Sequence, residues 1–220
     1  MEHSGIVQSD AANPEEAGVA LLEADLIRRA RRDDDAAWME LVRRHQEPVF
    51  RLAYLTLGSG GTAADAEDVA QETFVRAYLK LEQFEDGRPL RPWLLAIAAN
   101  LARNRRRSHG RYWAALRRWW QRVGELSAVE PAPADHGAMY ERWQADRLWQ
   151  AVQRLSPDHQ QAVYLRYFLD LSEEEMAATL DVAPGTVKSR LYRARQALRA
   201  VIEAEFLELY EEWSGDDRRK

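Results

Sequence analysis

Two arginine-rich segments carry the residues of this chain that could bind phosphate. Residues 88–122 contain ten arginines and no acidic residue, and residues 184–199 contain five basic residues and again no acidic one. Guanidinium and ammonium groups bind phosphate oxygens through charge-assisted hydrogen bonds. The whole chain carries a net charge of −5, from 31 basic and 36 acidic residues. The local electrostatic field, rather than the net charge, determines where an anionic ligand binds. The two segments therefore predict contacts with nucleic acid on an otherwise acidic protein.

The sequence contains no motif for the other common kinds of functional site. The absence of cysteine excludes disulfides, thiolate metal sites and cysteine nucleophiles. The glycine-rich stretch 58–61 is not followed by the Lys-Ser/Thr pair of a phosphate-binding P-loop. The five histidines are scattered, with no pair at the spacing of metal ligands: His3, His45, His109, His136 and His159. We therefore expect no catalytic residue, no metal and no cofactor, and predict that the chain is not an enzyme.

The segments around these arginines have the apolar spacing of α-helices. Glycine and proline are few and fall between periodic segments, and no stretch alternates as a β-strand does. We predict an all-α chain of two small helical domains joined by a flexible linker. The expected helices cover residues 21–32, 36–57, 63–83, 91–107, 140–155, 156–170, 172–180 and 184–209, with Pro48 kinking or splitting the second.

The domain boundaries follow shifts in composition. The expected order is a disordered tail at 1–20, a first domain at 21–108, a linker at 109–139, a second domain at 140–202 and an acidic extension at 203–220. The N-terminus is acidic and polar, unlike a signal peptide, and the longest uncharged apolar run, residues 93–102, is too short to cross a bilayer. We expect a soluble, cytoplasmic protein without membrane insertion.

The second domain contains the pattern of a helix-turn-helix. Ser172 and Glu175 form a capping box that begins a short helix, and Pro184 begins a longer one after a three-residue turn. With Val187 and Leu191 buried, the opposite face carries residue types that reach phosphates and base edges in a major groove: Lys188, Ser189, Tyr192 and Arg193. The alternative is a plain three-helix bundle with a solvated basic face.

Both domains resemble parts of the extracytoplasmic-function (ECF) sigma factors of bacterial RNA polymerase. In the first domain, AWMELVRRHQEPVFRLAY, DAEDVAQETFVRAYLKLEQF and RPWLLAIAANLARNRRR resemble region 2. In the second, LSPDHQQAVYLRYFLDLSEEEMAATLDVAPGTVKSRLYRARQALR resembles region 4. The resemblance covers roughly residues 24–202 in the family's order, and DAEDVAQETF and GTVKSRLYRAR are its most specific stretches.

The resemblance implies that an acidic helix of the first domain docks on core RNA polymerase. In the family this segment contacts the clamp coiled coil of the largest subunit, so the expected partners are the beta and beta-prime subunits. An acidic helix face suits a basic partner; the alternative is a solvated acidic face. The residues expected to bind core polymerase are Asp65, Glu67, Asp68, Gln71 and Glu72.

The resemblance also implies that the turn at 85–92 holds a flipped base of the single-stranded −10 element. Capturing an extruded base and its backbone offsets the stacking lost when the duplex opens. Trp93 could stack on that base or pack in the core against Leu52 or Phe74, and we favour phosphate contacts over base reading for Arg105 to Arg107. The residues expected at the −10 strand are Arg88, Arg91, Trp93, Asn100, Arg103, Asn104, Arg105, Arg106 and Arg107.

By the same resemblance, the last helix reads the −35 element as duplex DNA. The residues expected there are Thr186, Lys188, Ser189, Arg190, Tyr192 and Arg193. Arg190 is expected to touch the DNA backbone or to pack against the protein. Family members are commonly inhibited by an anti-sigma factor, which is a further expected partner although nothing in the sequence shows one. The aromatic linker, with Trp113, Trp119 and Trp120, could enter polymerase channels or bind a regulator.

Three functions remain open on the sequence, and the first is favoured. A dissociable promoter-specificity subunit needs polymerase in order to bind promoters. A DNA-binding regulator with a sensory N-terminal domain would bind duplex DNA alone and would have no turn for capturing a single strand. A DNA-processing enzyme would need a nucleophile or a metal cluster.

Overall fold

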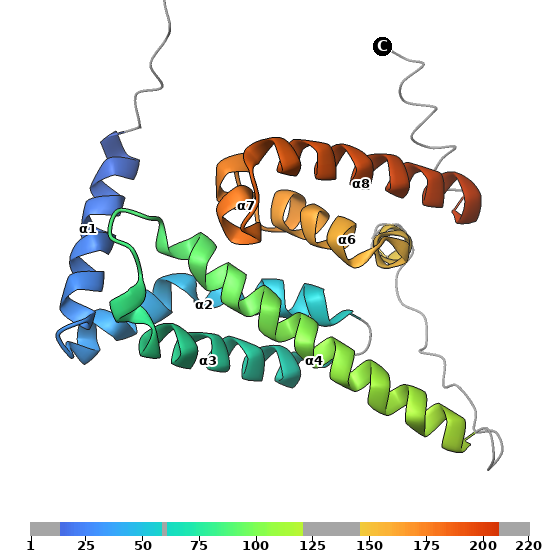
Figure 1. The fold of residues 1–220 in the computed structure, drawn as a ribbon, viewed down its shortest axis with the longest axis horizontal. Coiled ribbons are helices and arrows are strands. Elements are labelled where there is room, and N and C mark those ends of the chain that lie inside the picture. Colours follow the sequence, from blue (N-terminus) through green and yellow to red (C-terminus); the bar gives the residue numbers. More distant parts are fainter. Residues whose placement is uncertain (1–13, 59–60, 121–145, 207–220) are drawn as a thin grey trace, which may run out of the picture.

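The computed structural model describes residues 14–58, 61–120 and 146–206, with the backbone alone described at 14–21 and 109–120. These residues form helices and turns without any strand, as Figure 1 shows, which confirms the predicted all-α fold with two helical domains. The elements are α1 (Pro14–Ala30), α2 (Asp35–Leu57), α3 (Ala63–Leu79), the 3₁₀ turn η2 (Leu81–Gln83), α4 (Leu90–Trp120), a helical stretch at 146–154, α6 (Pro157–Val163), the π-helical turn η3 (Tyr164–Phe168), α7 (Glu173–Leu180) and α8 (Pro184–Glu205).

Side-chain caps set the starts of several helices. Thr62 and Asp65 form a capping box at α3, and Ser172 and Glu175 form the predicted one at α7. The side chain of Asp34 accepts a hydrogen bond from the amide of Ala37 at the start of α2. Each such cap contributes about 1 kcal/mol because it satisfies an amide that the first helical turn leaves without a partner.

The first domain is built around the contact between α2 and α4. Helix α3 packs against both, and α1 packs on α2. The core between them includes Leu41, Leu52, Leu94 and Leu95, each at most 1% exposed. Helix α2 runs without interruption through Pro48, so the proline does not split it.

The second domain packs α6 against α8, with α7 set across the start of α8. Leu171, Met176 and Val187 are fully buried, and Leu191 is buried beside them, which confirms the predicted inner face of α8. Helix α7 ends at Asp181, whose left-handed backbone (φ 54°, ψ 52°) turns the chain toward α8. Aspartate tolerates this conformation, so the turn forms without the glycine that is common there.

Two helices differ in length from the sequence-based expectation. Helix α1 begins at Pro14, so residues 14–20 of the expected tail are helical, and α4 continues to Trp120, beyond the expected end at Arg107 and into the expected linker. The added part of α4 contains alanine, leucine and arginine, which favour helix, and no proline, while its single glycine costs only about 1 kcal/mol there. The rest of the expected linker, residues 121–139, lies outside the described residues, as do residues 140–145, where the second domain was expected to begin, and the tails at 1–13 and 207–220.

The two domains pack against each other. Helix α7 lies on α4, and η3 reaches α2 (Figure 1). Within the described ranges, no helix is both long and apolar enough to span a membrane.

Candidate nucleic-acid interface

The outer face of α8 is the most open of the predicted DNA-binding surfaces. Lys188 and Arg193 are exposed, and the side chain of Tyr192 is 60% exposed. The Lys188 ammonium lies 3.6 Å from a carboxylate oxygen of Glu173 on α7, at 71% side-chain exposure, so water screens this pair strongly. The Ser189 hydroxyl donates to the carbonyl of Thr186 at 3.0 Å. The helix-turn-helix therefore presents its predicted reading face to solvent.

The arginines of α4 do not share one face. A helix rotates by about 100° per residue, so Arg105 and Arg106 point in different directions. Arg105 lies 2.7 Å from Asp68 and 3.4 Å from Asp65, both on α3. Arg106 donates instead to Gln160 of α6 at 3.0 Å and to the carbonyl of Thr56 at 3.2 Å. Two of the expected polymerase-binding carboxylates therefore pair with an arginine that was expected to bind DNA.

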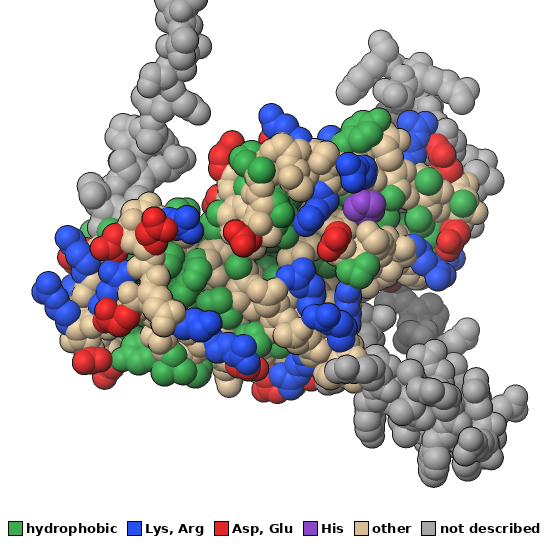
Figure 2. Space-filling model, viewed as in Figure 1, with side chains coloured by type: hydrophobic (Ala, Val, Ile, Leu, Met, Phe, Trp, Pro, Cys, Tyr) green, Lys and Arg blue, Asp and Glu red, His purple; other side chains and the backbone are tan. Residues whose placement is uncertain are grey.

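Arginines from both domains gather between α4 and the second domain. Arg103 donates to Gln161 of α6 at 3.0 Å. Burial lowers the pKa of Arg103, and the charges of Arg107, Arg106 and Arg190 lower it further, while Asp158 opposes them. Figure 2 shows basic side chains gathered over the middle of α4, close to the second domain. The arrangement concentrates positive charge where an anionic backbone would be attracted.

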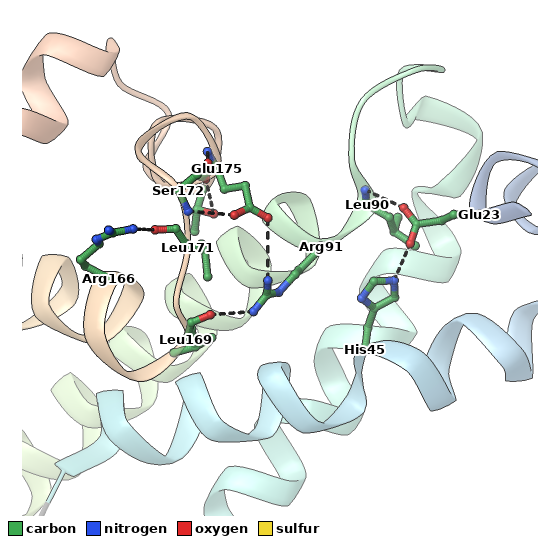
Figure 3. Close-up of polar contacts among 10 residues, drawn as sticks. Glu23, His45, Leu90, Arg91, Arg166, Leu169, Leu171, Ser172 and Glu175 are labelled. Carbon is green, nitrogen blue, oxygen red and sulfur yellow. Dashed lines mark hydrogen bonds and ion pairs between the residues drawn. The ribbon is translucent and has the colours of Figure 1, made fainter. Parts of the chain in front are cut away.

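Arg91 is held by the second domain at the start of α4. Its guanidinium donates to the carbonyl of Leu169 at 2.7 Å and lies 3.8 Å from the carboxylate of Glu175 (Figure 3). The same Glu175 carboxylate accepts from the Ser172 amide in the capping box, so Arg91 reaches the first turn of α7. Arg51 of α2 also contacts the second domain, because its guanidinium donates to the carbonyl of Phe168 at 3.3 Å.

The expected base-capturing turn lies opposite the helix-turn-helix. Residues 85–89 are exposed, and Arg88 pairs with Glu85 inside the turn at 2.9 Å. The half-buried Trp93 ring lies 4.9 Å from the ring of Phe84, whereas Phe74 packs edge-on against Trp38. A cavity of about 660 Å³ separates the turn from the second domain. Its walls include Phe84, Glu85, Arg88, Pro89 and Trp93 on one side and Ala178, Asp181 and Val182 on the other.

Most of the other expected residues lie along the exposed sides of their helices. Asn100, Asn104 and Arg107 are exposed on α4, and Thr186 is exposed on α8 while Arg190 is half-buried. On α3, Glu67, Gln71 and Glu72 are exposed, and Glu72 pairs with Arg76 at 2.6 Å.

Sequence reasoning missed two features of the interface. Val75 and Leu79 of α3 are 59% and 74% exposed and extend the acidic face with apolar surface. Their four-residue spacing, off the buried stripe of the helix, was the available signal. Gln160 and Gln161 of α6, each 5% exposed, accept hydrogen bonds from arginines of α4, and the sequence of this short helix gave no clear signal for them.

Comparisons with known proteins identify both domains. Residues 41–112 match the family model for sigma-70 region 2, and residues 145–198 match the one for sigma-70, region 4. The chain is 40% identical over 166 residues to the ECF RNA polymerase sigma factor SigE of Mycolicibacterium smegmatis, which covers 74% of this chain and 60% of that relative. It is 31% identical over 189 residues to the ECF RNA polymerase sigma-E factor of Salmonella typhimurium, covering 81% of this chain and 93% of the relative.

A solved structure has the same overall fold. The sigma factor RpoE from Bartonella quintana, solved in complex with the anti-sigma factor NepR, has a TM-score of 0.53 and 27% identity, covering 76% of this chain and 97% of that one. Sigma factors are initiation factors rather than enzymes, so these matches confirm both the resemblance and the prediction that the chain is not an enzyme. The chain belongs to the ECF family of RNA polymerase sigma factors, which act in transcription initiation.

Proposed function

We propose that this chain binds core RNA polymerase and directs it to promoters by reading the −35 element as duplex and capturing the melted −10 non-template strand. The observation that carries the proposal is the exposed face of α8, with Lys188, Tyr192 and Arg193 on a helix-turn-helix, in one chain with a region 2 domain. An α-helix of this kind fits the major groove, where such side chains reach base edges and phosphates.

Helix α3 is the proposed docking surface for core polymerase, with the beta and beta-prime subunits as partners. Its exposed acidic side chains, Glu67 and Glu72, lie beside the exposed apolar Val75 and Leu79. Charge complementarity guides such an encounter, and burial of the apolar side chains stabilises it.

Strand capture by α4 requires the two domains to move apart. Arg91, Arg103 and Arg106 donate to groups of the second domain and are therefore engaged in the packed chain. The turn and α7 also face each other across the cavity. One to two turns of duplex, roughly 34–70 Å, separate promoter elements that two domains read independently. We propose that docking on core polymerase separates the domains and frees these arginines for the −10 strand.

An anti-sigma factor is the proposed regulator. The structure of Bartonella quintana RpoE contains such a partner, NepR, and RpoE shares the fold of this chain. An inhibitor that kept the domains together would leave Arg91, Arg103 and Arg106 occupied.

Run-off transcription with core polymerase on a promoter library tests the proposal. We expect initiation only when the chain is added, from a family of related promoters. Lys188→Ala and Arg193→Ala should each change the preferred −35 bases, by about 1–3 kcal/mol for a base contact. A contact to phosphate alone should weaken all promoters alike.

Arg199→Ala is the matched control, because Arg199 lies on the same helix, about 16 Å along its axis from Lys188, and its removal changes the net charge equally. We expect Arg199→Ala to leave the preferred bases unchanged. The proposal would be contradicted if transcription did not depend on the chain, or if neither Lys188→Ala nor Arg193→Ala changed the preferred −35 bases.

A further inference from the structure

The turn between η2 and α4, residues 84–89, is open to solvent at its tip and held at both ends. Gly87 at the tip has φ 83°, and a Cβ placed there would meet no atom within 4 Å. The side chains that hold the ends, Glu23 and Arg31, belong to the segment that precedes the region 2 match at 41–112. In Figure 1 the turn rises beside α1.

Arg31 holds the first end of the turn. Its Nε donates to the carbonyl of Leu81 at 3.0 Å, and its Nη2 donates to the carbonyl of Phe84. Its Nη1 pairs with the carboxylate of Asp86 at 2.6 Å. The Arg31 side chain is only 16% exposed, although Asp86 is 73% exposed. A guanidinium can serve three acceptors at once because its donors form a rigid planar fork, which a lysine ammonium lacks.

Glu23 holds the second end of the turn. Its Oε2 accepts from the amide of Leu90, the first residue of α4, at 3.3 Å, and its Oε1 lies 2.9 Å from Nε2 of His45 (Figure 3). Burial alone would raise the pKa of Glu23, but the hydrogen bond and charge of His45, with the Leu90 amide, lower it overall. The ionised carboxylate stabilises the positive N-terminal end of α4.

We propose that Arg31 and Glu23 are positioning residues that hold turn 84–89 in the shape that captures a base of the −10 strand. The proposal rests on the proposed function, and it assigns a role to the segment before the region 2 match. With both ends fixed, base capture has to order only the exposed tip, so binding loses less entropy. Turn 84–89 and Trp93 line the cavity of about 660 Å³, so a displaced end would deform its wall.

Holoenzyme binding to a forked promoter with a single-stranded −10 segment tests this role. The promoter is one selected by the run-off library, in two forms: with all bases, and with the captured −10 base replaced by an abasic site. For the native chain we expect about a tenfold loss of affinity at the abasic site, since stacking contributes this much per base. For Arg31→Ala we expect weak binding to both forms and a loss of less than twofold between them.

Controls separate positioning from folding. Arg32→Ala removes the neighbouring exposed arginine and should behave as the native chain does. Arg31→Lys keeps the charge but not the fork, so it should lose the abasic penalty while it still folds and keeps the native affinity for core polymerase. If Arg31→Ala fails to fold, Arg31→Lys alone tests whether Arg31 positions the turn. A full tenfold penalty in Arg31→Lys would overturn the role of Arg31. A native chain that shows no abasic penalty would instead contradict the proposed function.

Discussion

Neighbouring arginines on α4 serve different partners. Arg105 binds Asp65 and Asp68 within the first domain, whereas Arg103 and Arg106 bind glutamines of the second. The sequence predicted a basic run but not this division, because the partners come from segments about 40 to 60 residues away. Helical geometry separates adjacent side chains, and only the tertiary fold decides which partner each one meets.

Tyr164 gives a prediction for alkaline stability. It is 1% exposed, accepts a hydrogen bond from Gln153 at 2.7 Å, and burial raises its pKa to about 12, from 10. Because the folded state resists ionisation, the stabilisation is complete below pH 10 and is lost as the pH rises toward 12. We expect the free energy of unfolding to fall by up to about 3 kcal/mol over this window.

Urea unfolding at several pH values between 8 and 12 measures this loss. Tyr164→Phe should remove the part of the alkaline loss that belongs to this hydroxyl, while Tyr192→Phe, at a 60% exposed position, should leave the profile unchanged. An equal alkaline loss in Tyr164→Phe and in the native chain would show that Tyr164 is not its source.

At the scale of elements, the sequence predicted helix caps and turns better than it predicted the lengths of helices. The capping box at Ser172, the turn at Asp181 and the start of α8 at Pro184 stand where the sequence predicted them, because each depends on a few adjacent residues. The extension of α4 to Trp120 was not predicted. Gly110 stands just beyond the expected end at Arg107, but one glycine is too weak a helix breaker to stop the helix there. The π-helical turn η3 was also missed; the Leu169 amide donates to the Tyr164 carbonyl, a span one residue longer than in an α-helix.

The capping box at Ser172 gives a prediction for helix α7. Ser172→Ala removes the hydroxyl that accepts from the Glu175 amide at 3.1 Å. We expect the free energy of unfolding to fall by about 1 kcal/mol, measured by urea denaturation. Ser172→Thr keeps a capping hydroxyl and should cost less than half as much. Equal losses in the two variants would mean that the cap does not stabilise α7.

At the scale of the whole molecule, the packing of the two domains is the feature that the sequence could not predict. Arg91 reaches Leu169 and Glu175 across 78 and 84 positions of the chain, and no local pattern encodes such a contact. The expected DNA-binding residues consequently fall into two groups. Most of those on α8 are open to solvent, while several on α4 are turned toward the second domain. A free chain in this state offers DNA an incomplete surface.

The fluorescence anisotropy of labelled promoter DNA, titrated with the chain alone and with the chain plus core polymerase, tests the central claim most directly. We predict weak, salt-sensitive binding by the chain alone, because its acidic surfaces repel DNA and its α4 arginines are engaged within the protein. With core polymerase we predict tight binding that depends on both promoter elements. Tight, promoter-specific binding by the isolated chain would contradict the account.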